Sequence, residues 1–281
     1  MPLQLYRYPI RFYFLSAVIP WSFWAVAAYL SRLDNAADYE LLLSGLGLLG
    51  LCGPIFVAAF FFLKDKELLQ DLKSRFFNFG DSRKIYLVIT VLIMPVSILL
   101  AMAISLLFGY SADQFVLTGK TSFSSGLFPA WFFLLLAPAL EELAWHSYGT
   151  DCLRQRFNLF NTSIIFSFYW VIWHVPLAFI DGYYHNNLVL EGVIYNLNFT
   201  LSLFVLVFLM NWLYYKTGRN ILVPIVIHTA ANTFNEIFAT HPDSKVIQTG
   251  LLLVVFIIVI VKEKELFFKR GMDDVVAKPG F

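Results

Sequence analysis

Residues 85–108 read IYLVITVLIMPVSILLAMAISLLF, a run of 24 residues without a charged side chain. As an α-helix this run would be about 36 Å long, at 1.5 Å per residue. The apolar core of a bilayer is roughly 30 Å thick, so the run is long enough to cross it. The stretch therefore predicts a transmembrane helix and an integral membrane protein.

Apolar runs of similar length recur on both sides of this one. Some contain proline, which membrane helices tolerate where neighbouring helices satisfy the freed backbone groups. The predicted fold is all-α, a polytopic membrane protein of about eight transmembrane helices forming a single integral membrane domain over residues 1–281. The predicted spans are Phe12–Leu30, Leu41–Leu63, Ile85–Phe108, Leu127–Ser147, Phe160–Ile180, Val193–Tyr215, Ile221–Phe238 and Val246–Val261.

Composition supports lipid as the main solvent. The chain is 59% hydrophobic and 14% charged, with a mean hydropathy of +0.70, whereas soluble domains are near one quarter charged. The net charge of +1 gives no basic footprint, so we expect no nucleic-acid partner. Cys52 and Cys152 lie in different segments, which indicates no disulfide framework.

The distribution of Lys and Arg predicts the orientation. With the N-terminus in the cytoplasm, 17 of the 20 basic residues fall in inside segments, and only Arg32, Lys120 and Lys245 fall outside. This bias agrees with the positive-inside rule and predicts that both termini are cytoplasmic. Residues 64–84 then form a cytoplasmic loop or an interfacial helix, and residues 262–281 form a cytoplasmic tail.

Polar residues interrupt three of the spans, within a core at about residues 127–238. Ionisable groups inside a membrane are energetically costly and are by default candidates for function. The candidates, in chain order, are Glu141, Glu142, His146, Trp170, His174, His228, Asn232 and Asn235.

Helical spacing predicts how these side chains face. Glu142 and His146 are four residues apart, so they share a face and can pair directly. His228, Asn232 and Asn235 follow a helical repeat and line one stripe of their span. Glu141 points about 100° away from Glu142, towards a different neighbour, and is left free for chemistry.

This set of groups has the components of a peptide hydrolase that needs no Ser or Cys nucleophile. A carboxylate near a histidine can activate water as a general base. A second histidine and an asparagine amide can donate to a developing oxyanion. The same atoms could instead bind zinc through Glu141, His174 and His228, with a fourth position for water. No cofactor is predicted in the first case, and Zn²⁺ in the second.

The sequence offers further candidate residues and two alternative functions. His185 and His241 fall in predicted outside loops, and we read both as non-catalytic. Asp151 and Arg154 follow the glutamate motif, and we read them as interfacial. A non-enzymatic membrane binding or immunity protein, or a proton- or ion-coupled transporter, are the alternative functions; clustering of the polar groups towards one side argues against transport.

The ordered motifs resemble the CPBP family of intramembrane proteases, also called Abi, which includes the type II CAAX prenyl endopeptidases. The motifs are EELAWH at 141–146, WVIWH at 170–174 and HTAAN at 228–232, with the family-like run NWLYYKTG at 211–218. Each motif alone is weakly specific, but the ordered set is specific. The resemblance is clearest over Leu127–Asn235.

The resemblance implies an eight-helix core with a conical cavity open to the cytoplasmic side and to lipid. Its implied activity is cleavage of membrane-associated or prenylated peptides, at a site nearer the cytoplasmic side. By the same resemblance, Glu141 would be the general base acting with His174 on a water. His228 and Asn232 would stabilise the oxyanion, and Glu142 would orient or support them.

The sequence departs from the family pattern beside the glutamates. His146 stands where the family usually has Arg, and Ser147 stands where Gly usually follows. Arginine is always charged, whereas a buried histidine can be neutral. This change bears on how Glu142 is held. Trp170 in place of Phe is a milder change.

Overall fold

The computed structural model describes residues 3–76, 84–118, 121 and 129–269. In these ranges the regular secondary structure is helical, with one isolated bridge between Leu117 and Phe238. The helices are η1 (Leu3–Leu5), α1 (Pro9–Leu30), η2 (Ala36–Tyr39), α2 (Glu40–Lys64), α3 (Lys66–Phe76), α4 (Lys84–Ser105), η4 (Leu106–Phe108), η5 (Ala112–Phe115), α5 (Ala130–Ala144), η6 (Trp145–Gly149), α6 (Thr150–Arg154), α7 (Leu159–His174), η7 (Val175–Phe179), α8 (Tyr184–Glu191), α9 (Val193–Lys216), α10 (Leu222–Glu236), α11 (Pro242–Lys262) and α12 (Lys264–Phe268).

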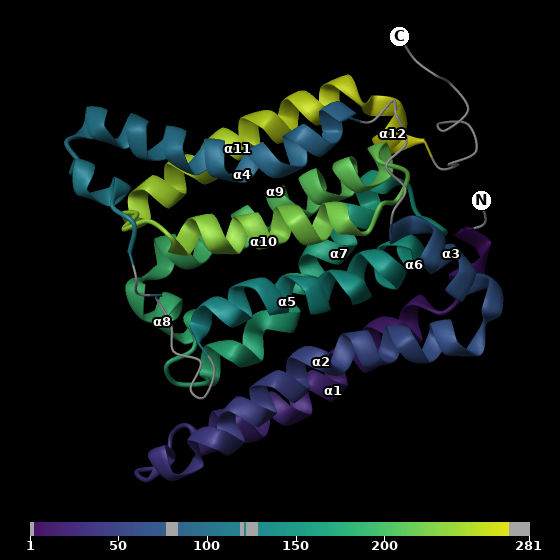
Figure 1. Cartoon of the computed structure of the whole chain (residues 1–281), viewed down its shortest axis with the longest axis horizontal. Coiled ribbons are helices and arrows are strands. Elements are labelled where there is room, and N and C mark those ends of the chain that lie inside the picture. The colour runs from purple at the N-terminus through teal and green to yellow at the C-terminus, as the bar shows by residue number, and fades with distance from the viewer. Residues whose placement is uncertain (1–2, 77–83, 119–120, 122–128, 270–281) are drawn as a thin grey trace.

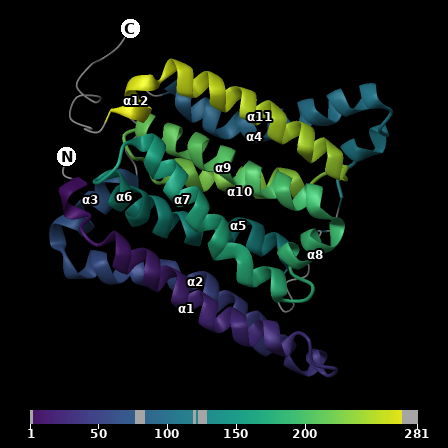
Figure 2. The ribbon, with the colours of Figure 1, turned by 180° about the vertical axis from the view of Figure 1, so that it is seen from behind.

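The long helices pack side by side in successive layers (Figures 1 and 2). The α1–α2 pair forms one edge of the bundle and the α4–α11 pair forms the other, with α5, α7, α9 and α10 between them. The helices at both edges expose large apolar side chains: Phe14 on α1 is 62% exposed and Val96 on α4 is 53% exposed. Such surfaces suit contact with lipid rather than water.

Each of the eight predicted spans coincides with a helix. Six helical segments are long and apolar enough to cross a membrane: Pro9–Leu30, Ala36–Lys64, Lys84–Phe108, Leu159–Phe179, Val193–Lys216 and Pro242–Lys262. The other two predicted spans correspond to α5 and α10, the 15-residue helices that carry the glutamates, His228 and the asparagines. The chain is a multi-pass membrane protein, and the count of eight spans stays a prediction.

The helix that carries the glutamates contains a π-helical turn. The path runs without interruption from α5 through η6 to α6, and η6 is the π-turn Trp145–Gly149. Such turns insert one residue into an α-helix and occur frequently at functional sites. The missing side chain at Gly149 lets α1 pack closely, because an added Cβ would lie 2.7 Å from Phe12 Cε1.

The segment 64–84 forms a surface helix over the part that is described. α3 covers Lys66–Phe76, while residues 77–83 lie outside the described residues. The face that α3 turns to the protein holds Leu68, Asp71 and Arg75, at helical spacing. The two charged members of this face take part in the ionic cluster described below.

Candidate active site

A cavity of about 550 Å³ lies among α2, α5, α7, α8, α9, α10 and α11. Six of the eight predicted site residues line it: Glu141, Trp170, His174, His228, Asn232 and Asn235. The other two, Glu142 and His146, lie behind the wall with no solvent exposure. The structure thus brings the motifs of three separate helices around one space.

The Glu142 carboxylate is held by two histidines. Its Oε2 contacts His146 Nδ1 one turn along the same helix, as the spacing predicted. Its Oε1 lies 2.8 Å from Nδ1 of His228 on α10. A carboxylate only accepts hydrogen bonds, so each of these ring nitrogens carries the proton when Glu142 is ionised. Glu142 therefore joins the glutamate motif to the α10 motif.

His146 passes this contact on to a third helix. Its Nε2 lies 3.1 Å from Oδ1 of Asn211 on α9, whose Nδ2 in turn donates to Ser163 Oγ at 2.8 Å. The histidine that stands in the usual Arg position thus reaches a polar partner on each side. Asn211 belongs to the NWLYYKTG run, the sequence signal that pointed to this segment.

The Glu141 carboxylate is held by two indole groups. Trp170 Nε1 on α7 donates to Oε2 at 2.9 Å, and Trp145 Nε1 donates to the same oxygen at 3.4 Å. Glu141 faces the cavity and a different neighbour from Glu142, as expected from the 100° step between adjacent residues. Trp145 was not among the predicted site residues, although it follows Glu141 at the same i, i+4 spacing by which His146 follows Glu142.

His174 lies at the C-terminal end of α7, where the helix gives way to η7. Pro176 has no amide hydrogen to donate to the carbonyl of Ile172, so the regular α-helical bonding stops here. His174 Nδ1 lies 2.7 Å from the carbonyl oxygen of Trp170. A carbonyl can only accept, so Nδ1 carries a proton, and in the neutral ring Nε2 is left as an acceptor.

The α10 residues form the predicted stripe. His228, Asn232 and Asn235 all line the cavity, and the His228 ring meets the Trp170 ring edge-on at 5.1 Å between centroids. Asn235 Nδ2 donates to the carbonyl of Ala231 at 2.8 Å. This contact holds the Asn235 side chain against its own helix at the cavity wall.

The structure corrects the predicted placement of His185. It lies on α8 rather than in a loop, lines the cavity, and stacks on the ring of His174 at 4.9 Å between centroids. Its Nδ1 is buried without a hydrogen-bond partner among the described residues. His241, by contrast, is half exposed at the start of α11, outside the cavity lining.

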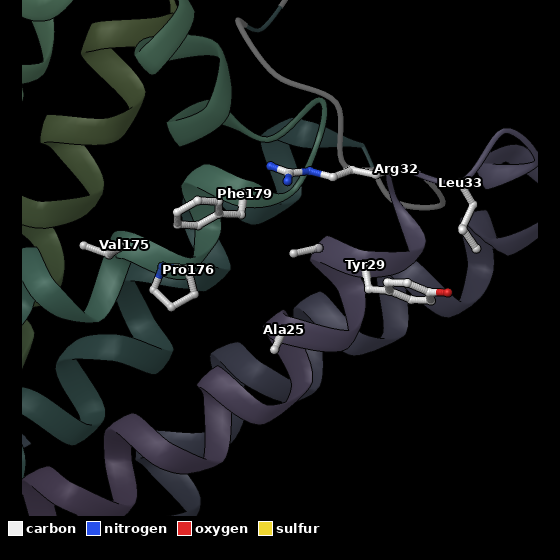
Figure 3. Close-up of a pocket in the computed structure, with 8 residues that line it drawn as sticks. Ala25, Tyr29, Arg32, Leu33, Val175, Pro176 and Phe179 are labelled. Carbon is white, nitrogen blue, oxygen red and sulfur yellow. The ribbon is translucent and has the colours of Figure 1, made fainter.

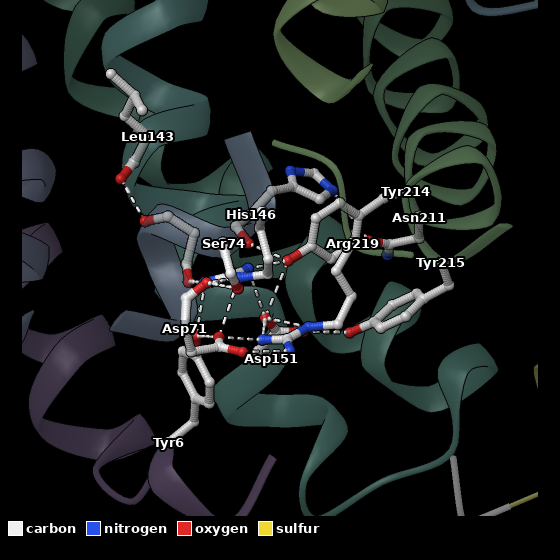
Figure 4. Close-up of polar contacts among 12 residues, drawn as sticks. Tyr6, Asp71, Ser74, Leu143, His146, Asp151, Asn211, Tyr214, Tyr215 and Arg219 are labelled. Carbon is white, nitrogen blue, oxygen red and sulfur yellow. Dashed lines mark hydrogen bonds and ion pairs between the residues drawn. The ribbon is translucent and has the colours of Figure 1, made fainter. Parts of the chain in front are cut away.

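Asp151 and Arg154, for which an interfacial position stays a prediction, do not face solvent. Both are buried in the protein, at 0% and 1% exposure. Arg154 donates to the carbonyls of Phe157 and Lys269, at 2.9 and 3.2 Å. Asp151 belongs to the ionic cluster, which comprises Asp71, Arg75, Asp151 and Arg219 with the hydroxyls of Tyr6, Tyr214 and Tyr215 (Figure 4).

The ionic cluster binds the π-turn directly. Arg75 Nη2 donates to the carbonyl of Ser147 at 2.8 Å, and the Tyr214 hydroxyl lies 2.7 Å from the carbonyl of His146 (Figure 4). Both carbonyls belong to the turn that follows the glutamates. Sequence spacing could not show this arrangement, because the cluster is assembled from α3, α6, α9 and the turn after α9.

A second hollow, of about 510 Å³, lies between the end of α1 and η7 (Figure 3). It is wide open, and its lining is mostly apolar, with Ala25, Tyr29, Val175 and Phe179 on its walls and Arg32 at its rim. It holds none of the predicted site residues. We therefore assign the chemistry to the cavity that the predicted site residues line.

The zinc alternative requires three donors to converge. Among the residues that the structure describes, no group of three His, Cys, Asp or Glu side chains is arranged to hold a metal ion. Glu141 is held by indole nitrogens, and His228 directs Nδ1 to Glu142. We derive no step through a metal from this arrangement.

The cavity and the chain ends lie at opposite ends of the bundle. Beyond the site, the lining comes from α8, the end of α10 and the start of α11, whereas η1 and α12 lie at the other end (Figure 1). Two predictions concern the cytoplasmic side: that both termini lie there, and that the site is nearer to it. If the cavity opens at its α8 end, these two predictions place the cytoplasm at opposite ends of the bundle. Each stays a prediction.

Comparison with known proteins agrees with the motifs. Residues 123–234 match the family model described as type II CAAX prenyl endopeptidase Rce1-like. The chain is 34% identical over 268 residues to a protein named CAAX prenyl protease 2 from Methanococcus maripaludis, across 94% of this chain and 98% of the relative. The segment matched by the family model contains the predicted site residues that line the cavity, except Asn235, which lies one residue beyond it. The chain is a protease and belongs to the family of type II CAAX prenyl endopeptidases.

Proposed function

We propose that the chain hydrolyses a peptide bond of prenylated, CAAX-type substrates within its cavity, using a water activated by Glu141 and His174. The observation that carries the proposal is that Glu141, His174, His228 and Asn232 line one cavity. The name of the relative supports the substrate class. The bilayer is the second partner, because a prenyl chain partitions into lipid.

Activation of water is assigned to Glu141 and His174. Both indoles donate to Oε2 of Glu141, so Oε1 can take a proton from the water. His174 accepts a second hydrogen of the water at Nε2, since its Nδ1–H is committed to the Trp170 carbonyl. The water oxygen then attacks the peptide carbonyl carbon, and the proton on Glu141 passes to the leaving amine as the C–N bond breaks.

Stabilisation of the oxyanion is assigned to α10. With Nδ1–H directed to Glu142, His228 in its imidazolium form donates Nε2–H to the carbonyl oxygen of the substrate. The Asn232 amide, one turn along the helix, supplies the second donor. Glu142, held on its other side by His146, keeps His228 in this orientation.

The test uses purified protein in lipid vesicles with a fluorogenic farnesylated peptide. Glu141→Ala and His174→Ala each remove a group that handles the proton, so we expect kcat to fall by about 10²–10⁴-fold. His241→Ala is the matched control, because that histidine lies outside the cavity lining and should retain full turnover. Wild-type turnover in both site variants would contradict the proposal.

The same preparation separates the metal-free route from a zinc-dependent one. We propose the metal-free route, because the described side chains present no three-donor group. Elemental analysis of active protein, with a chelator control, tests it. One zinc per chain together with loss of activity on chelation would favour the zinc route.

A further inference from the structure

The charged side chains along the cavity are unequally distributed. Three carboxylates line it, those of Glu141, Glu191 and Glu236. Among the lining residues that the structure describes, Lys245 is the one Lys or Arg. An anionic group of a substrate would be repelled by the three carboxylates unless it were placed beside this ammonium group.

We infer that Lys245 binds the free C-terminal carboxylate of the substrate and so selects peptides that end three residues after the cleaved bond. This inference rests on the proposed function, because it assigns a role within the same cavity. In a CAAX motif, a cysteine is followed by three residues that end the chain. The product carrying the carboxylate is therefore a tripeptide.

The position of Lys245 fits the length of such a tripeptide. Lys245 Nζ lies 3.9 Å from Oε1 of Glu236, at the C-terminal end of α10. Glu236 is eight residues beyond His228 on this helix, a rise of about 12 Å. Three extended residues span about 10 Å. A peptide whose cleaved carbonyl lies at His228 and Asn232 thus places its terminal carboxylate beside Lys245.

Lys245 can accept this extra partner. The Lys245 side chain is 26% exposed, and its contact with Glu236 is at the outer limit of an ion pair. An ammonium group has three donors, so a single long contact leaves others for a second carboxylate. The Glu236 carboxylate is nearly buried, at 6% exposure, and competes with a substrate carboxylate for this ammonium group.

The experiment compares two farnesylated peptides that differ only at the C-terminus, one a free acid and the other an amide. We expect wild-type protein to have at least a tenfold higher kcat/KM for the acid. Lys245→Met should remove this preference by lowering kcat/KM for the acid alone, so unchanged turnover of the amide shows that the variant is folded. If Lys245→Met does not fold, Lys245→Gln makes the same test with a polar side chain.

Lys216→Met is the matched control. Lys216 is also partly exposed, at 28%, and is also paired with a glutamate, Glu263, but it lies outside the cavity lining. This variant should keep the wild-type preference. Glu236→Gln removes the competing carboxylate, so it should keep or increase the preference for the acid.

The outcomes separate the two proposals. Equal kcat/KM for acid and amide in the wild type, or an unchanged preference in Lys245→Met, overturns the role of Lys245 and leaves the protease activity intact. Cleavage of neither peptide overturns the proposed function, and this inference falls with it.

Discussion

At the scale of single residues, the two adjacent glutamates beside the cavity have different surroundings. Glu142 is fully buried between two imidazoles, whereas Glu141 faces the cavity and accepts from two indoles. A buried carboxylate whose partner is removed is strongly destabilising. The pairing therefore stabilises the fold as well as orienting His228.

This argument predicts how Glu142 and His146 couple. His146→Ala leaves Glu142 with only one histidine partner, and we expect a loss of about 3–5 kcal/mol, the usual cost of breaking a buried pair. Glu142→Gln added to His146→Ala removes the uncompensated charge, so the double variant should be more stable than His146→Ala alone. Melting temperatures of the three variants measure this coupling.

Strict additivity of the two substitutions would contradict the coupling of Glu142 and His146. A suitable control is Glu265→Gln, because Glu265 is exposed and pairs with Lys269 at the surface. Exposed pairs contribute little, about 0–1 kcal/mol.

Spacing along the chain predicted only part of this residue-level arrangement. The Glu142–His146 pair could be predicted, because an i, i+4 pair depends on one helix alone. The Trp145–Glu141 contact has the same i, i+4 spacing and could have been predicted in the same way. The amide of Asn211 could not, because it reaches His146 only through the packing of α9. The stacking of His185 on His174 depends on α8, which the sequence suggested was a loop.

At the scale of elements, the ionic cluster joins the surface helix α3 to the π-turn. Arg219, which has a positive φ of 66°, contacts both Asp71 and Asp151, and Arg75 contacts the same two carboxylates. Two guanidinium groups and two carboxylates balance in charge. Residues Lys66–Phe76 of the predicted loop or interfacial helix are helical, and α3 is anchored by charges rather than by apolar contact alone. Whether this helix lies at the membrane interface stays a prediction.

The acid sensitivity of this cluster can be predicted from Asp71. Burial by itself would raise the pKa of Asp71, but Arg75 and Arg219 outweigh it and hold that pKa below its usual value. The stabilisation from ionised Asp71 is therefore complete above about pH 3.9 and is lost as the pH falls through the lower pKa of the folded protein. We expect Asp71→Asn to lower the melting temperature at pH 7, and the gap from wild type to shrink below about pH 4.

Asp181→Asn serves as the control for the pH series. Asp181 is more than half exposed and lies 3.9 Å from Arg32, so its loss should change the melting temperature little at any pH. If the gap between wild type and Asp71→Asn stayed constant down to pH 3, the cluster would not owe its stability to an ionised Asp71.

At the scale of the whole molecule, the apolar runs predicted the helices, whereas the depth of the site in the membrane stays a prediction. Each run became a helix because a chain in lipid must satisfy its backbone polar groups internally. The helix of the glutamates does not end at Ser147. It continues through the π-turn to Arg154, which places Glu141 and Glu142 near the middle of the path from Ala130.

The opposite placement of cavity and chain ends gives a prediction about topology. His241 lies at the start of α11, beside the cavity lining, and Lys269 follows α12 at the other end of the bundle. A cysteine at each position should therefore react with a membrane-impermeant maleimide from opposite sides of sealed vesicles. From the charge bias we expect His241→Cys to react from outside and Lys269→Cys from the cytoplasmic side.

The native cysteines give the background for the labelling, since Cys52 is partly buried and Cys152 is buried. Labelling of both introduced cysteines from the same side would contradict the arrangement of the bundle across the membrane. Labelling from opposite sides but in the reverse order would keep the bundle and place the cavity at the cytoplasmic face. In that case the few basic residues near the cavity would outweigh the basic residues at the chain ends in setting the orientation, and a cytosolic prenylated peptide would meet Lys245 directly.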